Sequence, residues 1–371
     1  MATRSAPARA PVPAAPEMPW LPAQLNALLA QQGHALLLEG PSGLGQFALA
    51  MGWAKALLCE AHALGTPLAP ACGVCESCHA VQVHTHPDLL VLLPEAMQLD
   101  LGWSSADTDS ASEAKRKPSQ EIRVEAMRKM ITFCQRTDAR GRGKVVVVYP
   151  AESMNTVTAN ALLKTLEEPP GNSRFVLATE ASHRLLPTIR SRCHSWKMAW
   201  PADAEIHAWL SAGHSTAEQV QGAMQASGGR PQNAWELLQS GFEPQAWSQL
   251  PRQLLQGQAG LLAAASPSQT IAVLQQLCHD VMAMVVGAVP RYFSQDSLKP
   301  LVAHLGAQTG ETITQQLQQG GQSPRQRTLE RLAQWSVDLQ QAQRTSEHPF
   351  APELMLTALL DQASQALQAK R

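Results

Sequence analysis

The stretch His34-Ala35-Leu36-Leu37-Leu38-Glu39-Gly40-Pro41-Ser42-Gly43-Leu44-Gly45 decides the fold of this chain. It is a short apolar run followed by a glycine-rich turn. The apolar segment from Phe47 to Leu58 comes next and favours a helix by its length and its Ala and Leu content. A strand, a turn of the form Gly-x-x-x-x-Gly and a helix are typical of a phosphate-binding loop. The alternative, that Gly40 to Gly45 is only a tight turn, stays open.

Two more buried strands are predicted further along the chain. One is Lys144 to Val148, which contains four consecutive valines, and the other is Arg174 to Thr179. Helical patterns lie between the strands, including Val157 to Glu168. Strands that alternate with helices predict an α/β fold with a parallel sheet covered on both faces. After Pro201 the strand signals stop, and the remaining apolar residues are spaced as in helices.

The chain is expected to divide into four parts. Residues 1–18, rich in Ala and Pro, are predicted to be a disordered leader, and residues 19–200 form the α/β core. The core carries a metal-binding insertion at 59–78 and a mobile insertion at 97–119, the latter with a Lys115-Arg116-Lys117 cluster. A small helical domain (201–242) and a larger one (243–371) complete the chain.

Composition limits the class of protein. Of the 371 residues, 44% are hydrophobic and 16% are charged, which is ordinary for a globular protein. The net charge of −1 excludes a uniformly basic nucleic-acid coat. No apolar run approaches the roughly 20 residues that a membrane helix needs, and the N-terminus lacks the apolar core of a secretory signal. We therefore expect a cytoplasmic protein that does not enter a membrane.

The loop lacks the residues that make a phosphate site work. A working loop continues with Lys, which contacts the phosphates, and with Ser or Thr, which holds Mg²⁺. Here these positions are Gln46 and Phe47. After the valine strand, an ATPase would place Asp-Glu for the metal and for water activation, whereas this chain has Tyr149-Pro150. We therefore expect no functional ATP site.

Four of the seven cysteines gather between Cys59 and Cys78. Cys72-x-x-Cys75-x-x-Cys78 brings three thiolates onto one turn, and Cys59 can supply the fourth ligand of a closed, structural Zn²⁺ site. His79, His84 and His86 are other candidates for the fourth position. Four free buried thiols are the remaining alternative. The three remaining cysteines are isolated in the sequence and are assigned packing roles; they are Cys134, Cys193 and Cys278.

Two charged stretches do not indicate one particular function. The segment from Lys115 to Lys144 has an excess of Lys and Arg, which suits either phosphate contacts to DNA or a solvated helix face. Glu167-Glu168 ends a predicted helix just before Pro169-Pro170. This pair is interpreted as surface or interface residues and not as acid–base catalysts.

Several motifs in a fixed order resemble those of one protein family. They are Pro19-Trp20, His34 to Gly40, Cys72-x-x-Cys75-x-x-Cys78, His86-Pro87-Asp88, Asn160-Ala161-Leu162-Leu163-Lys164-Thr165-Leu166-Glu167-Glu168-Pro169-Pro170 and Leu186-Pro187-Thr188-Ile189-Arg190-Ser191-Arg192-Cys193. From about Trp20 to Pro201 the chain resembles the delta-prime family of bacterial DNA polymerase III clamp-loader subunits, an AAA+ family. His348-Pro349-Phe350 to Leu360 resembles that family's last collar helix. The family's motor relatives keep the Lys-Thr and Asp-Glu pairs that are missing here.

The resemblance implies an AAA+ (P-loop NTPase-like) module followed by a lid domain (201–242) and a collar or oligomerisation domain (243–371). It implies a non-hydrolysing member of a five-subunit ring, with Arg192 as an arginine finger given in trans to a neighbouring motor subunit. Arg190 is expected to be structural. The resemblance also favours Cys59 as the fourth zinc ligand.

The implied partners are the motor (tau/gamma) subunits, the delta subunit, the sliding clamp through the complex, and primed DNA in the assembled loader, near the nucleoid. The chain alone is expected to have no catalytic activity, although the holoenzyme is a DNA-directed DNA polymerase. Two alternatives stay open: an AAA+ ATPase motor with a divergent site, and a stand-alone zinc-containing nucleic-acid binder.

Overall fold

The computed structural model describes residues 17–31, 33–63, 65–103, 118–213, 215–307, 324–345 and 352–367. The chain splits into two compact units, Met1–Trp209 and Leu210–Arg371. Nearly all of the predicted leader, residues 104–117 of the predicted insertion at 97–119, and the motif at 348–350 lie outside the described residues. The start of that insertion belongs to the short helix α4 (Glu95–Asp100).

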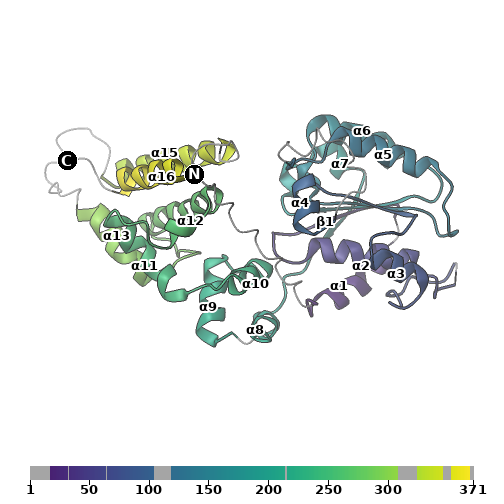
Figure 1. The fold of residues 1–371 in the computed structure, drawn as a ribbon, viewed down its shortest axis with the longest axis horizontal. Coiled ribbons are helices and arrows are strands. Elements are labelled where there is room, and N and C mark those ends of the chain that lie inside the picture. Colours follow the sequence, from purple (N-terminus) through teal and green to yellow (C-terminus); the bar gives the residue numbers. More distant parts are fainter. Residues whose placement is uncertain are drawn as a thin grey trace, which may run out of the picture. The chain divides into compact units, whose positions relative to one another are not determined.

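The first unit is built on a five-stranded parallel sheet (Figure 1). Its strands are β1 (Ala35–Glu39), β2 (Leu89–Leu92), β3 (Val145–Val148), β4 (Arg174–Thr179) and β5 (His194–Lys197). The order is β2-β3-β4-β1-β5, which places β1 between β4 and β5. The predicted parallel sheet is therefore confirmed. The sequence reasoning missed β2 and the largely exposed edge strand β5.

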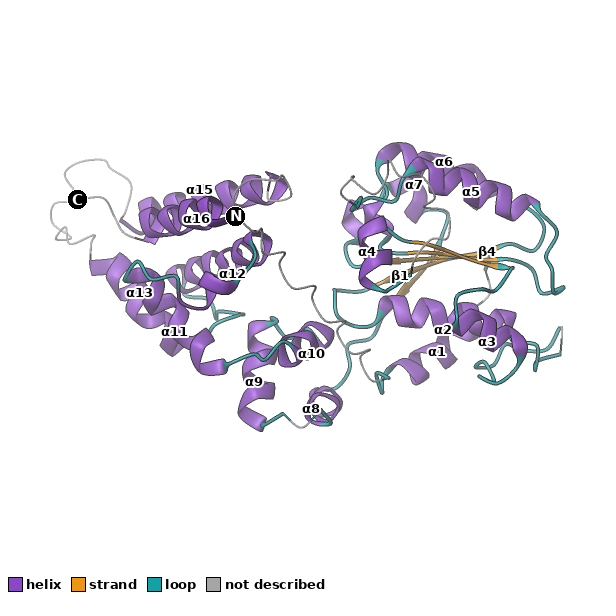
Figure 2. Cartoon of the chain, in the orientation of Figure 1, coloured by secondary structure: helices purple, strands orange, loops and turns teal. Residues whose placement is uncertain are grey.

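Helices cover both faces of the sheet, as Figure 2 shows. On one face lie α1 (Leu21–Leu29), α2 (Gln46–Leu58) and α3 (Glu76–Gln82); on the other lie α5 (Val124–Gln135), α6 (Thr156–Glu167) and α7 (Pro187–Arg190). Side chains alternate between the two faces along each strand. Thus Leu37, Val146 and Leu177 join the core beneath α5 and α6, while α2 packs on β3 and β4 from the other side.

The remaining elements are helical. They are η2 (Ala151–Ser153), η3 (Ser182–Arg184), α8 (Asp203–Ser211), α9 (Ala217–Ala226), α10 (Pro231–Gln239), α11 (Pro244–Leu255), η4 (Gly260–Ala264), α12 (Pro267–Val286), α13 (Gln295–Ala307), α15 (Pro324–Thr345) and α16 (Pro352–Leu367). The predicted lid–collar boundary at 242 falls in the turn between α10 and α11, and this division stays a prediction. Within the described ranges, no helix combines the length and the apolar character needed to cross a membrane.

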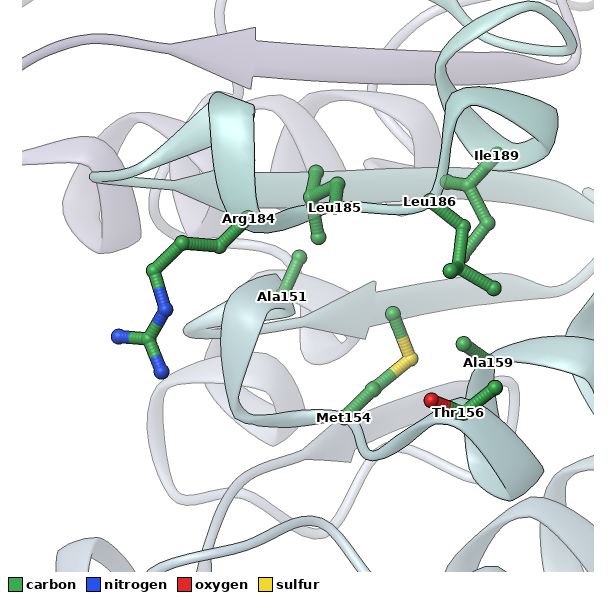
Figure 3. Close-up of a pocket in the computed structure, with 8 residues that line it drawn as sticks. All are labelled: Ala151, Met154, Thr156, Ala159, Arg184, Leu185, Leu186 and Ile189. Atoms are coloured by element: carbon green, nitrogen blue, oxygen red, sulfur yellow. The ribbon is translucent and has the colours of Figure 1, made fainter.

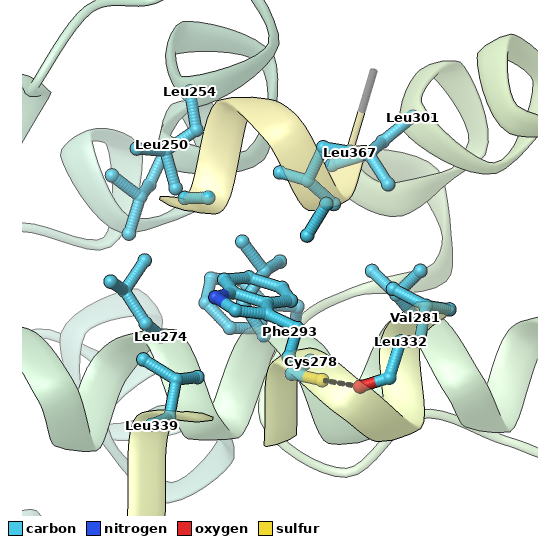
Figure 4. Packing of buried hydrophobic residues seen from close by; sticks show 14 of the residues in the cluster. Leu250, Leu254, Leu274, Cys278, Val281, Phe293, Leu301, Leu332, Leu339 and Leu367 are labelled. Carbon is cyan, nitrogen blue, oxygen red and sulfur yellow. Dashed lines mark hydrogen bonds between the residues drawn. The ribbon is translucent and has the colours of Figure 1, made fainter. Parts of the chain in front are cut away.

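The second unit has its own apolar core, part of which Figure 4 shows. Phe293 stacks on Trp247 with ring centroids 4.7 Å apart. The buried Cys278 thiol donates to the backbone oxygen of Leu332 at 3.3 Å. Burial raises the pKa of Cys278 to about 12. Cys278 therefore has the packing role assigned to it.

A buried carboxylate organises the turn that follows α12. Asp280 is fully buried and accepts hydrogen bonds from the backbone N–H groups of Arg291 (2.8 Å), Tyr292 (2.6 Å) and Phe293 (2.8 Å). Buried backbone donors are costly to leave without an acceptor. This one side chain therefore holds the segment that carries Phe293 into the core.

We predict that Asp280→Ala lowers the free energy of unfolding by about 3 kcal/mol, because three backbone N–H groups, of which that of Phe293 is buried, lose their acceptor. Urea denaturation followed by circular dichroism measures the change. The control is Asp361→Ala, since Asp361 is exposed and accepts a bond from Gln365 on the same helix. A loss of equal size in both variants would contradict the assigned role of Asp280.

Candidate functional site

The predicted phosphate loop lies between β1 and α2, at residues 40–45. Gly45 has a left-handed backbone, with φ of 89°. A Cβ at this position would lie 2.6 Å from the sulfur of Met18. Glycine is therefore required at Gly45 by both its conformation and its surroundings.

The side chain that replaces the phosphate-binding lysine is turned onto the loop itself. Gln46 is 1% exposed, and its Nε2 donates to the backbone oxygens of Gly40 (3.0 Å) and Pro41 (2.7 Å). A lysine at this position would instead carry a positive charge to the phosphates. The side-chain amide of Gln46 is therefore hydrogen-bonded to backbone carbonyl groups of the loop and is not directed toward a ligand.

Aromatic rings stand at the two positions where a metal-binding hydroxyl and carboxylate would be needed. Phe47 stacks on Tyr149, with centroids 5.2 Å apart, and Trp103 lies 5.9 Å from Phe47. The Tyr149 hydroxyl donates to Glu180 at 2.8 Å. An apolar ring cannot ligate Mg²⁺, which requires oxygen donors.

The start of α1 covers the loop from the N-terminal side. Trp20 Nε1 donates to the backbone oxygen of Leu44 at 2.9 Å. The ring of Trp20 also meets Trp209 of α8 edge-on, with centroids 5.3 Å apart. The Pro19-Trp20 motif thus links the loop to α8, a contact that sequence spacing alone does not indicate.

We predict that Gln46→Lys lowers the Tm and that Mg-ATP does not raise it again. The new ammonium would be buried without an anion, and Phe47 and Tyr149 would still occupy the metal positions. Thermal unfolding with and without Mg-ATP measures both effects. Gln82→Lys, at an exposed position on α3, is the matched control and should leave the Tm unchanged. A rise in Tm on adding Mg-ATP to Gln46→Lys would show that the site is intact.

The four clustered cysteines converge on one point. Cys59 follows the end of α2, Cys72 and Cys75 lie on the next loop, and Cys78 is on α3. Their sulfur atoms all lie within 4.8 Å of one another. The Cys59–Cys75 and Cys72–Cys78 sulfur pairs are 4.0 and 3.9 Å apart. A tetrahedral zinc with Zn–S bonds of about 2.3 Å needs sulfurs about 3.8 Å apart, so the cluster fits this ion.

Two of the three histidines that could compete for the fourth ligand position, His84 and His86, are engaged elsewhere. His84 packs on Trp103, with ring centroids 3.8 Å apart. His86 is buried and lies 3.0 Å from the hydroxyl of Ser77. Its Nδ1 accepts from the backbone N–H of Asp88 at 3.0 Å, so Nε2 carries the proton and donates to Ser77.

Within the cluster, backbone donors favour the thiolate form of Cys72, whereas burial disfavours that of Cys78. The N–H groups of Val74 and Cys75 lower the pKa of Cys72 to about 6. Burial raises the pKa of Cys78 to about 12. A thiolate is the metal-ligating form, and a cation among these sulfurs would favour it for every member.

A polar network ties the cysteine cluster to the sheet. Ser77 donates to Glu60 at 3.0 Å, and Arg140 pairs with the same carboxylate at 2.6 Å. Asp88, fully buried before β2, accepts from the backbone N–H groups of residues 139 and 140 at 2.8 and 3.0 Å. It also pairs with the buried Lys144 at 3.3 Å. This network gives structural roles to His86 and Asp88 of the His86-Pro87-Asp88 motif.

Several cations of the basic stretch 115–144 are bound within the unit. Arg123 pairs with Glu95 at 2.8 Å, and Arg142 donates to two backbone oxygens of the loop after Cys59. The Lys115-Arg116-Lys117 cluster lies outside the described residues. The described part of the stretch therefore gives more support to structural roles than to a continuous phosphate-binding track.

Arg192 lies at the surface between α7 and β5. Its Nε donates to Glu167 Oε1 at 2.6 Å, and its Nη2 contacts the same oxygen. Its Nη1 donates to the backbone oxygen of Thr188 at 2.9 Å. The side chain is 32% exposed, so the guanidinium is held but remains accessible. Sequence spacing could not reveal the pairing with Glu167, because the two residues are 25 positions apart.

Arg190 has different surroundings. Burial raises the pKa of Glu39, but hydrogen bonds from Ser182 and Ser195 together with the charge of Arg190 lower it overall. The charge of Arg190 thus stabilises the carboxylate of Glu39 at the end of β1. The neighbouring Cys193 is in a packing position, where burial raises its pKa to about 12.

A small pocket lies between η2, the start of α6 and the η3–α7 segment (Figure 3). It is lined by Ala151, Met154, Thr156, Ala159, Arg184, Leu185, Leu186 and Ile189. Six of these eight residues are apolar, and the guanidinium of Arg184 points away from the others. With a volume of about 50 Å³, it has no room for a nucleotide.

The parallel sheet of order β2-β3-β4-β1-β5, with a glycine-rich loop between β1 and α2, defines an AAA+ module of the P-loop NTPase type. A family model described as "DNA polymerase III, delta subunit" matches residues 23–201. DNA polymerase III subunit delta' of Pseudomonas aeruginosa is 38% identical over 256 residues, which are 67% of this chain and 69% of the relative. The Yersinia pestis protein of the same name is 33% identical over 71% of each chain.

The solved structure of a DNA polymerase III gamma subunit-related protein from Thermotoga maritima is also similar. It has a TM-score of 0.41 and 16% identity, and the match covers 94% of this chain and 100% of that chain. On the sequence matches, the chain belongs to the delta-prime family of DNA polymerase III subunits. The resemblance stated from the sequence motifs is thereby confirmed.

Proposed function

We propose that this chain is a non-hydrolysing clamp-loader subunit that lends Arg192 to the ATPase site of a neighbouring motor subunit. The observation that carries the proposal is the closed loop, in which Gln46 is bonded to Gly40 and Pro41. Phe47 and Tyr149, stacked at the metal positions, support the same conclusion. A chain with this loop contributes to ATP hydrolysis only through a group that it supplies to another subunit.

Arg192 is suited to that role by its chemistry and its position. A guanidinium stays charged at all physiological pH values and grips phosphate oxygens through a planar fork. When given in trans, it stabilises the charge that develops on the γ-phosphate. Its partly exposed position beyond α7 is what a group reaching into a partner requires.

The proposed partners follow from the family. A DNA polymerase III tau subunit from Salmonella typhimurium is 35% identical over 43% of this chain, so a related chain carries a similar module. We assign the motor role to tau/gamma subunits. The delta subunit, the sliding clamp and primed DNA complete the assembly in which this chain acts, in the cytoplasm near the nucleoid.

We predict that Arg192→Ala lowers the DNA-stimulated ATPase rate of the reconstituted clamp loader at least tenfold, because one active site loses its transition-state cation. The rate is measured after gel filtration has shown that the complex assembles. Arg190→Ala is the matched control and should keep the rate within about twofold of the original. An unchanged rate for Arg192→Ala in an assembled complex would leave this chain a scaffold alone.

We also propose that the four clustered cysteines hold a structural Zn²⁺. The converging sulfurs and the N–H groups that donate to them support this assignment. A closed set of four thiolates leaves no position for substrate, so the ion would stabilise the loop without taking part in chemistry. That loop has few apolar contacts of its own: Cys72 and Val74 are both exposed.

We predict that the purified chain carries one zinc and that Cys75→Ser loses most of it. The Tm should fall by roughly 5–10 °C, because metal binding and folding of the loop are coupled. Metal content is measured by mass spectrometry, and the Tm by calorimetry. Cys134→Ala, a buried cysteine outside the cluster, should keep the zinc. Equal zinc in both variants would overturn the assignment.

A further inference from the structure

Glu167, the residue that accepts hydrogen bonds from Arg192, is at an electrostatically unfavourable position in its helix. Glu167 is the last residue of α6, where the helix dipole presents its negative end and an acidic side chain is unfavourable. A second acid, Glu168, follows at the C-cap position. A locally unfavourable charge is typical of a functional position. Among the described residues, Arg192 alone donates hydrogen bonds to the Glu167 carboxylate.

Both members of this pair can separate without exposing a core. The side chain of Arg192 is 32% exposed and that of Glu167 is 48% exposed. Ion pairs between such side chains are weak, because water and salt screen them. Thr188 adds a backbone acceptor that holds Nη1 and keeps the arginine in place when the carboxylate leaves.

We propose that Glu167 is a positioning residue for Arg192: it holds and partly neutralises the guanidinium within this subunit until the γ-phosphate of the neighbour's ATP replaces it. This inference rests on the proposed function of Arg192. A terminal phosphate has more negative charge and more acceptor oxygens than one carboxylate. It therefore replaces Glu167 as the partner of the Arg192 guanidinium when the neighbour's ATP is close enough to contact it. Before that, the paired guanidinium has little attraction for phosphate.

The pairing can be tested on the isolated chain, independently of any partner. Phenylglyoxal modifies free guanidinium groups, and the rate at Arg192 can be followed by peptide mass spectrometry. Glu167→Gln should raise this rate two- to fivefold, the factor expected for loss of a surface ion pair. Glu168→Gln is the matched control and should leave the rate unchanged. An unchanged rate in Glu167→Gln would overturn the proposal.

The consequence for activity is tested in the reconstituted complex, without DNA. Glu167→Gln should raise the DNA-independent ATPase rate two- to fivefold, because Arg192 is no longer neutralised before ATP arrives. The double variant Glu167→Gln/Arg192→Ala should have the low rate of Arg192→Ala. A rate in Glu167→Gln that is unchanged or lower, or an increase that survives in the double variant, would overturn the positioning role. If Arg192→Ala alone has no effect, the proposed function itself fails, and this result is distinct from the others.

Discussion

Parallel pairing of β1 with β4 is the constraint on which the site depends. Parallel strands end at one edge of the sheet, so the residues that follow β1, β3 and β4 meet there. The glycine-rich loop, Tyr149 and Glu180 are these residues. At this edge the loop side chain Gln46 and the Phe47–Tyr149 ring pair contact groups of the chain itself.

The cysteine cluster depends on the same sheet through buried polar groups. Asp88, just before β2, gathers backbone N–H groups and the Lys144 ammonium, while His86 extends the network to Ser77 and Glu60. Buried networks of this kind hold a single geometry only when every member has a partner. The cluster is therefore positioned by the core as well as by its own turn.

Much of the fold could be predicted from local patterns, because the valines of β3 and the glycines before α2 are strong signals. The replacements at Gln46 and Tyr149 were also visible as departures from a motif. What the sequence could not reveal were contacts between distant segments: the indole of Trp20 on Leu44, and the guanidinium of Arg192 on Glu167. The largely exposed strand β5 was missed because its His-Ser-Trp-Lys pattern lacks the apolar run of a buried strand.

The self-closed loop has an evolutionary consequence. Restoring a nucleotide site would require a lysine at Gln46, a hydroxyl at Phe47 and a carboxylate at Tyr149. Each replacement alone would remove a packed or hydrogen-bonded side chain and give no binding in return. Every single substitution toward a nucleotide site is therefore expected to give a less stable protein with no gain of binding. The three side chains support one another, so the proposed non-hydrolysing role would be hard to reverse by single substitutions.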